Sequence, residues 1–228
     1  METKYETFAP YGPLIYRADI RGEFNDFLLE GLSEFRSKEY DASSKLVGNI
    51  ENQRYSPYNP KKFIKFIDPH ILNYINERYE RTLCIHRNTF GNEKNNYLDP
   101  KKCAIKYHLG EGPWINFTTN GEFNPMHNHS GVMSSVIFID IPDEIAIERE
   151  TSGFQAKAAG CLDLISQDQH IVVRPVSGTM YLFPAHLWHL VYPYHSDVER
   201  ISMSFNVWDV FLNDEKYNCS NLNHSNYE

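Results

Sequence analysis

The sequence predicts a mainly β protein with flanking helices, of the sandwich or jelly-roll kind. From about Cys103 onward, short apolar segments alternate with turn residues at close spacing, as in antiparallel sandwiches and jelly rolls. Before that point, apolar residues recur at intervals of three and four, as on the buried face of a helix. No repeat divides the 228 residues. We therefore expect one domain over 1–228, with a helix-rich part over 1–100, a β core over 101–210 and a tail over 211–228 that is poorly ordered.

The helix-rich part predicts one short strand, two helices and a loop. Residues 13–18 have the composition of a strand, and the apolar stripe from Phe24 to Phe35 predicts an amphipathic helix. Asp68-Pro69 predicts the start of a second helix, since Pro is favoured at the first helical position. Residues 49–60 are polar and rich in proline, which favours a loop or lid between the helices.

The β core predicts seven strands separated by turns. Turn residues are supplied by Gly110 and Gly112, by Asn120-Gly121 and by Ser177-Gly178. The predicted strands are 104–108, 114–118, 132–139, 161–165, 171–173, 179–183 and 201–208.

Composition excludes several classes of function. The net charge of -8 argues against a nucleic-acid partner, which usually requires a basic face. No apolar run approaches the roughly 20 residues that span a bilayer, and the N-terminus lacks the apolar segment of a signal peptide. The four cysteines are widely spaced and form no C-x-x-C pair. We therefore expect a soluble cytoplasmic protein that binds neither nucleic acid nor membrane.

The pair His127-Asn128-His129 is the strongest chemical motif of the chain. Residues i and i+2 of an extended segment project on the same side, so both imidazoles can reach one metal ion. An isolated H-x-H is a weak signal, because motif matches have real false-positive rates. The pair gains weight only if a distant residue completes the site.

His189 is the preferred third ligand. It follows the predicted strand 179–183 in the segment Pro184-Ala185-His186-Leu187-Trp188-His189. His186 stays an alternative on position alone. Two ligands one residue apart with a distant third are typical of a mononuclear metal site in a β-barrel.

Arg200 and Ser202 form the last element of the pattern. Both lie on one face of a strand if residues 200–206 are extended. A guanidinium that faces a β core needs an anionic partner, because a buried unpaired charge is costly. A carboxylate fits its planar donors, and a hydroxyl two residues away can share the contact. The alternative is an arginine on the outer face.

Together these residues resemble the Fe(II)/2-oxoglutarate-dependent oxygenases, whose core is a double-stranded β-helix (jelly roll). The common pattern is H-x-[D/E], a distal His and an Arg about ten residues later. The chain is most similar to an oxygenase group of bacteria and phages, through Trp114-Ile115-Asn116, Gly121 and the segments 124–129, 183–189 and 200–206. Residues 45–50 add a weaker likeness.

The resemblance implies an enzyme that uses Fe(II), 2-oxoglutarate and O2. Fe(II) would be held by His127, His129 and His189. The distal carboxylate of 2-oxoglutarate would pair with Arg200, helped by Ser202. Asn116 and Asn206 would hydrogen-bond the co-substrate or a ligating histidine. 2-Oxoglutarate would be decarboxylated to succinate while a C–H bond of the primary substrate is hydroxylated.

His129 departs from the family pattern, because it stands where a carboxylate is expected. Three neutral imidazoles would leave the full charge of Fe(II) uncompensated until an anion binds. A carboxylate from elsewhere, such as Asp140, is the alternative ligand.

Two other classes remain open. A cupin-type dioxygenase without 2-oxoglutarate would share the histidines, although Met133 and Ser134 stand where its glutamate is expected. A non-catalytic β-sandwich could hold the metal structurally, although such zinc sites usually have four ligands, often thiolates. The primary substrate is predicted only as a small molecule or a peptide, with prolyl peptides included. The loop Tyr55-Ser56-Pro57-Tyr58-Asn59-Pro60 would shape its groove, or else pack as plain structure.

Overall fold

The computed structural model describes residues 4–8, 12–36, 38–56, 58–90, 98–110, 112–167 and 169–217. Its three α-helices are α1 (Glu23–Phe35), α2 (Pro60–Phe90) and α3 (Asp143–Thr151). Its strands are β1 (Tyr5–Phe8), β2 (Ile15–Asp19), β3 (Asn52–Tyr55), β4 (Ile105–Leu109), β5 (Trp114–Thr118), β6 (Asn124–His127), β7 (Met133–Asp140), β8 (Leu162–Ser166), β9 (Gln169–Val173), β10 (Thr179–Pro184), β11 (Trp188–Val191), β12 (Arg200–Ser204), β13 (Asn206–Leu212) and β14 (Glu215–Lys216).

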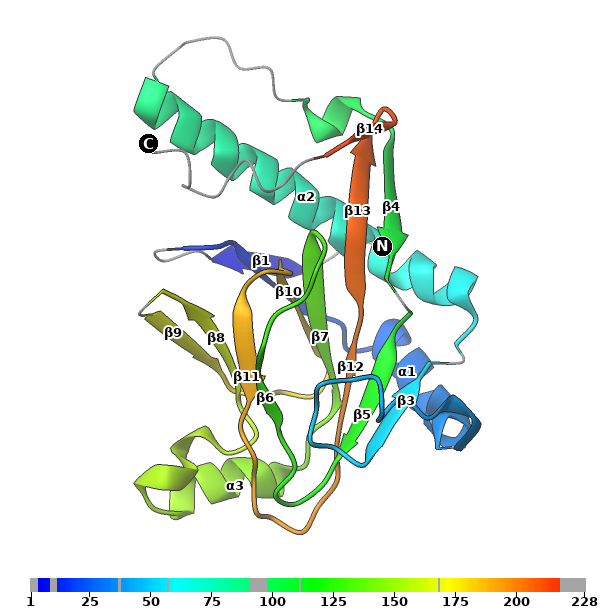
Figure 1. Cartoon of the computed structure of the whole chain (residues 1–228), viewed down its shortest axis with the longest axis vertical. Helices are drawn as coiled ribbons and strands as arrows, with labels where there is room; N and C mark the ends of the chain where they lie inside the picture. The colour runs from blue at the N-terminus through cyan, green and yellow to red at the C-terminus, as the bar shows by residue number, and fades with distance from the viewer. Residues whose placement is uncertain are drawn as a thin grey trace.

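The strands form two antiparallel sheets (Figure 1). The large sheet has the order β1-β2-β10-β7-β12-β5-β3, with β13 joined to β7 and to β4. The small sheet has the order β6-β11-β8-β9. From β5 to β12 the chain passes repeatedly from one sheet to the other. This winding is a double-stranded β-helix, so the predicted fold class is confirmed.

The large sheet is buried on both faces. One face packs on α1 and α2 through a core that includes Leu28, Ile71, Ile137 and Met203. The other face packs on the small sheet through a second core that includes Phe138, Leu164 and Phe183. Ile137 and Phe138 are neighbours in β7 and belong to different cores, as the alternation of side chains along a strand requires. Helices α1 and α2 thus cover the sheet face that is turned away from the small sheet.

Helix α1 is confirmed, whereas the predicted start of α2 is wrong. The helix begins at Pro60, and Pro69 lies inside it. The side-chain oxygen of Asn59 accepts bonds from the backbone amides of Lys61 and Lys62, so Asn59-Pro60 supplies the cap. The pair Asp68-Pro69 has the same chemistry, and only the packing of the preceding turn distinguishes the two positions.

The sequence predicted a single loop over residues 49–60. This prediction is wrong, because the segment contains β3. This strand pairs with β5, which places Gln53 opposite Asn116 and Tyr55 opposite Trp114. Its polar composition hid it from the hydrophobic pattern. Tyr58 does not border a groove either: its ring packs in the core against Phe35, and its hydroxyl donates to the carbonyl of Leu28.

The other differences lie at strand ends. The predicted strand 201–208 is two strands, β12 and β13, which meet at Phe205. The start of the predicted tail is ordered, since β14 pairs with β13, and residues 218–228 lie outside the described residues. The short elements β1, β6, β11 and α3 were not predicted. No helix in the described part of the chain is long and apolar enough to cross a membrane.

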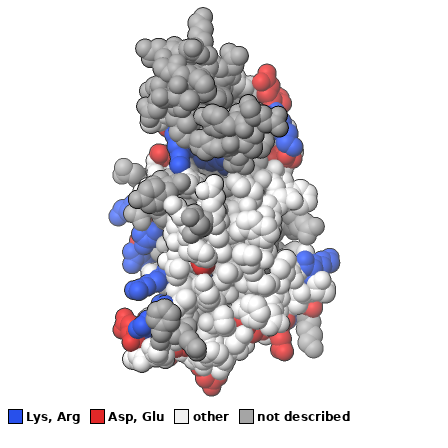
Figure 2. Space-filling model, turned by 60° about the vertical axis from the view of Figure 1, so that its left-hand side comes forward, with Lys and Arg blue, Asp and Glu red and all other residues white. Residues whose placement is uncertain are grey.

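Figure 2 shows the side of the molecule that lies to the left in Figure 1. Charged side chains lie mainly along the margins of this face, and its middle is mostly uncharged.

Candidate functional site

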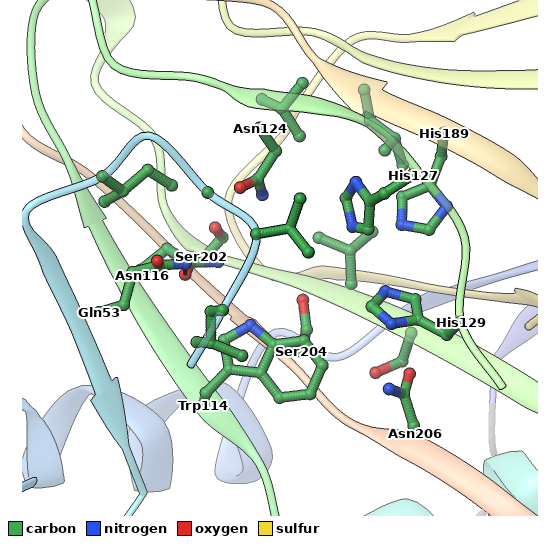
Figure 3. Close-up of a pocket in the computed structure, with 18 of the residues that line it drawn as sticks. Gln53, Trp114, Asn116, Asn124, His127, His129, His189, Ser202, Ser204 and Asn206 are labelled. Atoms are coloured by element: carbon green, nitrogen blue, oxygen red, sulfur yellow. Dashed lines mark hydrogen bonds between the residues drawn. The ribbon is translucent and has the colours of Figure 1, made fainter. Parts of the chain in front are cut away.

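A cavity of about 260 Å³ opens between the two sheets. Strands of both sheets line it, and so does the segment of residues 45–50. Figure 3 shows His127, His129 and His189 on one side of the cavity, with Gln53, Asn116 and Ser202 on the other. All seven predicted site residues line it: Asn116, His127, His129, His189, Arg200, Ser202 and Asn206.

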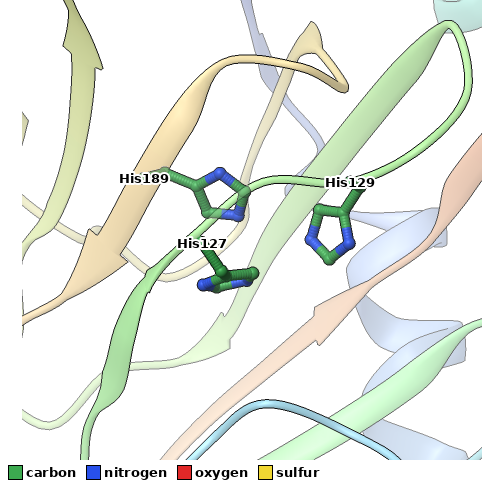
Figure 4. A group of neighbouring side chains, drawn as sticks. All are labelled: His127, His129 and His189. Carbon is green, nitrogen blue, oxygen red and sulfur yellow. The ribbon is translucent and has the colours of Figure 1, made fainter.

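Two strands of the small sheet bring the histidines together. His127 ends β6 and lies opposite His189 of β11 in the antiparallel register. His129 follows β6, and its backbone amide donates to the carbonyl of Ala185 at 2.9 Å. The available ring nitrogens of the three side chains all lie within 4.8 Å of one another (Figure 4). The expected trio is therefore one cluster, although His129 is positioned by a loop bond and not by strand alternation.

The cluster distinguishes His189 from the alternative His186. His189 is 6% exposed and faces the cavity, whereas His186 is exposed and does not line it. His186 precedes His189 by three residues and lies in the turn before β11, whereas His189 lies within the strand.

Backbone carbonyls hold two of the imidazoles in the form that binds a metal. The Nδ1 atom of His127 lies 2.7 Å from the carbonyl oxygen of Pro125, and that of His189 lies 2.9 Å from the oxygen of Leu187. A carbonyl only accepts, so each Nδ1 must carry the proton and each Nε2 has a free lone pair. Such bonds fix the tautomer and orientation of ligating histidines in metalloproteins.

Burial keeps the cluster uncharged at neutral pH. It lowers the pKa of His129 to about 4 and that of His189 to about 3, and in both residues the nearby His127 lowers it further. The pKa of His127 is also lowered by burial. Neutral imidazole is the form that coordinates a metal, so no proton has to leave before an ion binds.

The cluster contains no carboxylate. Among the described residues, the side chains grouped closely enough to hold an ion are the three histidines. Asp140, the alternative ligand, is exposed at the end of β7 and does not line the cavity. The donor set is therefore three neutral nitrogens, which suits Fe, Zn or Cu.

Arg200 faces the cavity from β12 and is the largest fully buried side chain, at 2% exposed. Its Nε and Nη2 atoms have no hydrogen-bond partner. No carboxylate of the described residues pairs with it, and the ring of Phe138 lies 5.4 Å from its guanidinium carbon. Burial lowers its pKa to about 10, so it still carries its charge at neutral pH. A buried cation with free donors is the complement of an anion.

Polar side chains of β12, β5 and β3 form rows beside Arg200. Arg200 lies opposite Thr118, and Ser202 lies opposite Asn116, which in turn faces Gln53. The amide nitrogen of Gln53 donates to the side-chain oxygen of Asn116 at 2.9 Å. This bond leaves the Asn116 NH2 group to serve as a donor.

The side-chain amide of Asn206, which also lines the cavity, is likewise oriented by a hydrogen bond. The hydroxyl of Ser134 donates to its side-chain oxygen at 2.8 Å, which leaves its NH2 group as a donor. The cavity thus combines three neutral metal ligands with a buried cation and two oriented amides.

Several lining residues were missed. Trp114 and Thr118 flank Asn116 at i±2, so strand alternation alone predicts them. Gln53 could not be predicted, because β3 lacks an apolar pattern. Gly48 lies so close that an added Cβ would meet Asn124 and would come within 2.9 Å of Gln53. The segment 45–50 therefore closes this side of the cavity, and Tyr55, the first residue of the expected loop 55–60, also lines the cavity.

A family model described as "Putative 2OG-Fe(II) oxygenase" matches residues 112–206. These residues run from the turn before β5 to the start of β13 and include every predicted metal and co-substrate residue. The resemblance predicted from the sequence is confirmed over this segment, and with it the enzyme class. No curated protein shows significant sequence similarity to the chain.

Three solved structures are similar in outline. A prolyl-4-hydroxylase of Pseudomonas putida is 15% identical, with 90% of this chain and 91% of that one covered at a TM-score of 0.43. A Trichoplax adhaerens prolyl hydroxylase, in complex with a hypoxia inducible factor peptide fragment, is 12% identical, with 85% and 83% covered at 0.47. A 2OG-Fe(II) oxygenase family oxidoreductase of Burkholderia pseudomallei is 19% identical, with 52% and 53% covered at 0.34. With TM-scores below 0.5, these likenesses support no conclusion about this chain.

Proposed function

We propose that the protein binds Fe(II) and 2-oxoglutarate in this cavity and hydroxylates a primary substrate held at its mouth. The observation that carries the proposal is the buried Arg200, whose free donors share one cavity with the three-histidine cluster. A metal centre alone does not account for a buried guanidinium without an acidic partner. A co-substrate that carries its own carboxylates accounts for both features.

His127, His129 and His189 would hold the metal. In His127 and His189 the Nε2 atoms are the free donors, because the Nδ1 atoms face carbonyl oxygens. Three protein ligands would leave coordination positions for a co-substrate and O2, as a non-haem Fe(II) oxygenase requires. The residues present thus fit the ion in donor type, number and protonation.

Arg200 and Ser202 would hold the distal carboxylate of 2-oxoglutarate. A guanidinium binds a carboxylate through two parallel charge-assisted bonds, and Ser202 lies two residues along the same face. The oriented NH2 groups of Asn116 and Asn206 would bind co-substrate oxygens. Each amide has its oxygen occupied by another side chain, so neither can turn an acceptor toward the anion.

Charge balance favours a dianionic co-substrate. With three neutral ligands, the bound metal keeps two positive charges, and Arg200 adds a third. Burying such charge is costly unless anions enter with it. 2-Oxoglutarate would offset two of these charges, so we expect the absence of a ligating carboxylate to make metal and co-substrate binding cooperative.

When bound, Fe(II) and 2-oxoglutarate together would supply the activation of O2 that hydroxylates a C–H bond, with succinate and CO2 as co-products. The chain would bind and orient them and limit access of water. The primary substrate is a small molecule or a peptide. Prolyl peptides belong to that set, because the oxygenase family that the sequence resembles includes prolyl hydroxylase-like members. A cytoplasmic location stays a prediction from the sequence.

The first experiment is turnover of 2-oxoglutarate by the purified protein. We expect succinate to form when Fe(II) is present and not when Zn(II) replaces it. A cupin-type enzyme or a structural metal site would show neither succinate formation nor binding of 2-oxoglutarate. The absence of both succinate formation and 2-oxoglutarate binding in the wild-type protein would overturn the proposal.

A further inference from the structure

Trp208 is an exposed aromatic residue at the mouth of the cavity. It lines the cavity together with His129 and Ser130, yet it is 47% exposed. Single exposed apolar side chains are common on protein surfaces and need no explanation. Trp208 differs from them because three backbone features hold its ring in place.

The first feature is a bulge in β13. The register with β4 shifts between Val207, which pairs with Leu109, and Asp209, which pairs with His108. Trp208 is the additional residue of this bulge. Bulges redirect a side chain relative to the regular alternation and are frequent next to active sites.

The other two features are glycines that make room for the indole. A Cβ added at Gly110 would lie 2.6 Å from the Nε1 atom of Trp208 and 3.1 Å from each neighbouring ring carbon. The distances to the two carbons are only slightly longer than the distance to the nitrogen. The added Cβ would therefore lie over the face of the indole ring and not in its plane. At Gly131, which has φ +106, an added Cβ would lie 3.0 Å from the Trp208 Cα atom. One face of the indole ring therefore packs against backbone, and the exposed area of Trp208 belongs to the rest of the ring.

The size of the cavity places the primary substrate at this mouth. About 260 Å³ is below the 300–1,000 Å³ of typical ligand sites. The metal and 2-oxoglutarate would take up much of that space, so the primary substrate must extend outward past the rim. Among the residues lining the cavity, Trp208 and Val47 are the large apolar side chains that are exposed.

From these observations we propose that Trp208 determines substrate specificity by stacking on a planar aromatic ring of the primary substrate. The proposal rests on the proposed function above. Offset or edge-on aromatic contact adds to simple burial, and a ring already fixed by its backbone loses little freedom on binding.

The neighbouring charges favour a neutral or anionic ring over a cation. Lys45 lines the cavity and is exposed, with its ammonium 5.6 Å from the ring centre of Tyr55. Asp209, next to Trp208, is paired with Lys216. A cationic group over the indole would thus share the cavity with the Lys45 ammonium, and the carboxylate next to Trp208 already has a cationic partner.

The test uses the full chain with ¹⁵N-labelled tryptophan, loaded with Zn(II) and 2-oxoglutarate. The chain has three tryptophans, so three indole N–H signals are expected, assigned with Trp208→Phe and Trp188→Phe. Phenol and cyclohexanol are the probes, because they match in size and differ in planarity. Methylguanidinium tests the cation alternative. Trp188 is the internal control, since it is also 47% exposed but does not line the cavity.

We expect phenol to shift the Trp208 signal with an affinity about 2- to 10-fold higher than that of cyclohexanol, while the Trp188 signal stays in place. Gly110→Ala should abolish the difference, because its Cβ would displace the ring. Gly153→Ala is the matched control, since an added Cβ there meets nothing within 4 Å.

Equal affinities for phenol and cyclohexanol, tighter binding of methylguanidinium, or unchanged phenol binding in Gly110→Ala would each overturn the proposal. Succinate formation by the wild-type protein without any probe is measured in parallel. Failure of the ring contact and failure of the oxygenase function are therefore told apart.

Discussion

Arg200 is the residue on which the proposed chemistry depends most. Replacing it with Lys keeps the charge but removes the planar pair of donors, and replacing it with Met removes both. We expect affinity for 2-oxoglutarate to fall about 10-fold in Arg200→Lys and about 100-fold in Arg200→Met, since hydrogen bonds to charged groups contribute about 1.5–3 kcal/mol. Isothermal titration of the metal-loaded protein measures both values.

Metal affinity in the absence of 2-oxoglutarate should stay within a few-fold of wild type in both variants. Arg36→Met is the matched control, because Arg36 is exposed and pairs with Glu199, next to Arg200 in sequence. Unchanged 2-oxoglutarate affinity in Arg200→Met would contradict the claim that Arg200 binds the co-substrate.

Individual residues were the most predictable part of the site. The spacing of His127, His129, His189 and Arg200 predicted side chains that the structure brings to one cavity. Their supporting contacts were not predictable, because Gln53 and Ser134 act through single hydrogen bonds across strands. Such contacts depend on register, which a single sequence does not reveal.

At the scale of elements, α2 is joined to the large sheet by a buried hydrogen bond. The Nδ1 atom of His70 in α2 lies 2.9 Å from the hydroxyl of Tyr16 in β2. Burial lowers the pKa of His70 to about 4, so the imidazole that shares this bond with the Tyr16 hydroxyl is neutral in the folded protein.

This bond predicts a pH dependence of stability. The unfolded chain takes up a proton at His70 near pH 6.5, whereas the folded chain does so only near pH 4. The contribution of His70 is complete above about pH 6.5 and is lost as the pH falls toward 4. Between pH 7 and pH 5 we expect it to lower the free energy of unfolding by about 2 kcal/mol.

Urea unfolding of the wild type and of His70→Asn at the two pH values isolates this term. The variant keeps an amide that can hydrogen-bond the Tyr16 hydroxyl but cannot take up the proton. Between pH 7 and pH 5 its free energy of unfolding should therefore fall by about 2 kcal/mol less than that of the wild type. Parallel pH profiles for the two proteins would contradict the assignment.

Helix α1 and most core strands were predictable because each has an apolar face of the right period. The strand β3 and the start of α2 were not, since β3 is polar and two Asx-Pro pairs compete for the helix start. The bulges near His127 and at Trp208 also lie beyond pattern reasoning, because the extra residue is defined only by the partner strand.

At the scale of the whole molecule, the winding between the sheets creates the site. The small sheet supplies His127 and His189, whereas the large sheet supplies Arg200, Ser202 and Asn116. The metal cluster and the anion end thus come from opposite walls of one cavity. Most core strands were predictable from the sequence, but β6, β11 and the division of residues 201–208 into β12 and β13 were not. The pairing partners of the strands were not predictable either, so the resemblance to a known family was needed to name the β-helix.

The central claim is that one cavity holds both a metal on three histidines and a carboxylate on Arg200. A crystal structure of the protein with Mn(II) and 2-oxoglutarate tests it most directly. We expect the metal about 2.0–2.3 Å from one nitrogen each of His127, His129 and His189, and a carboxylate about 2.7–2.9 Å from the Arg200 guanidinium. A metal bound without His129, or 2-oxoglutarate bound away from Arg200, would contradict the account.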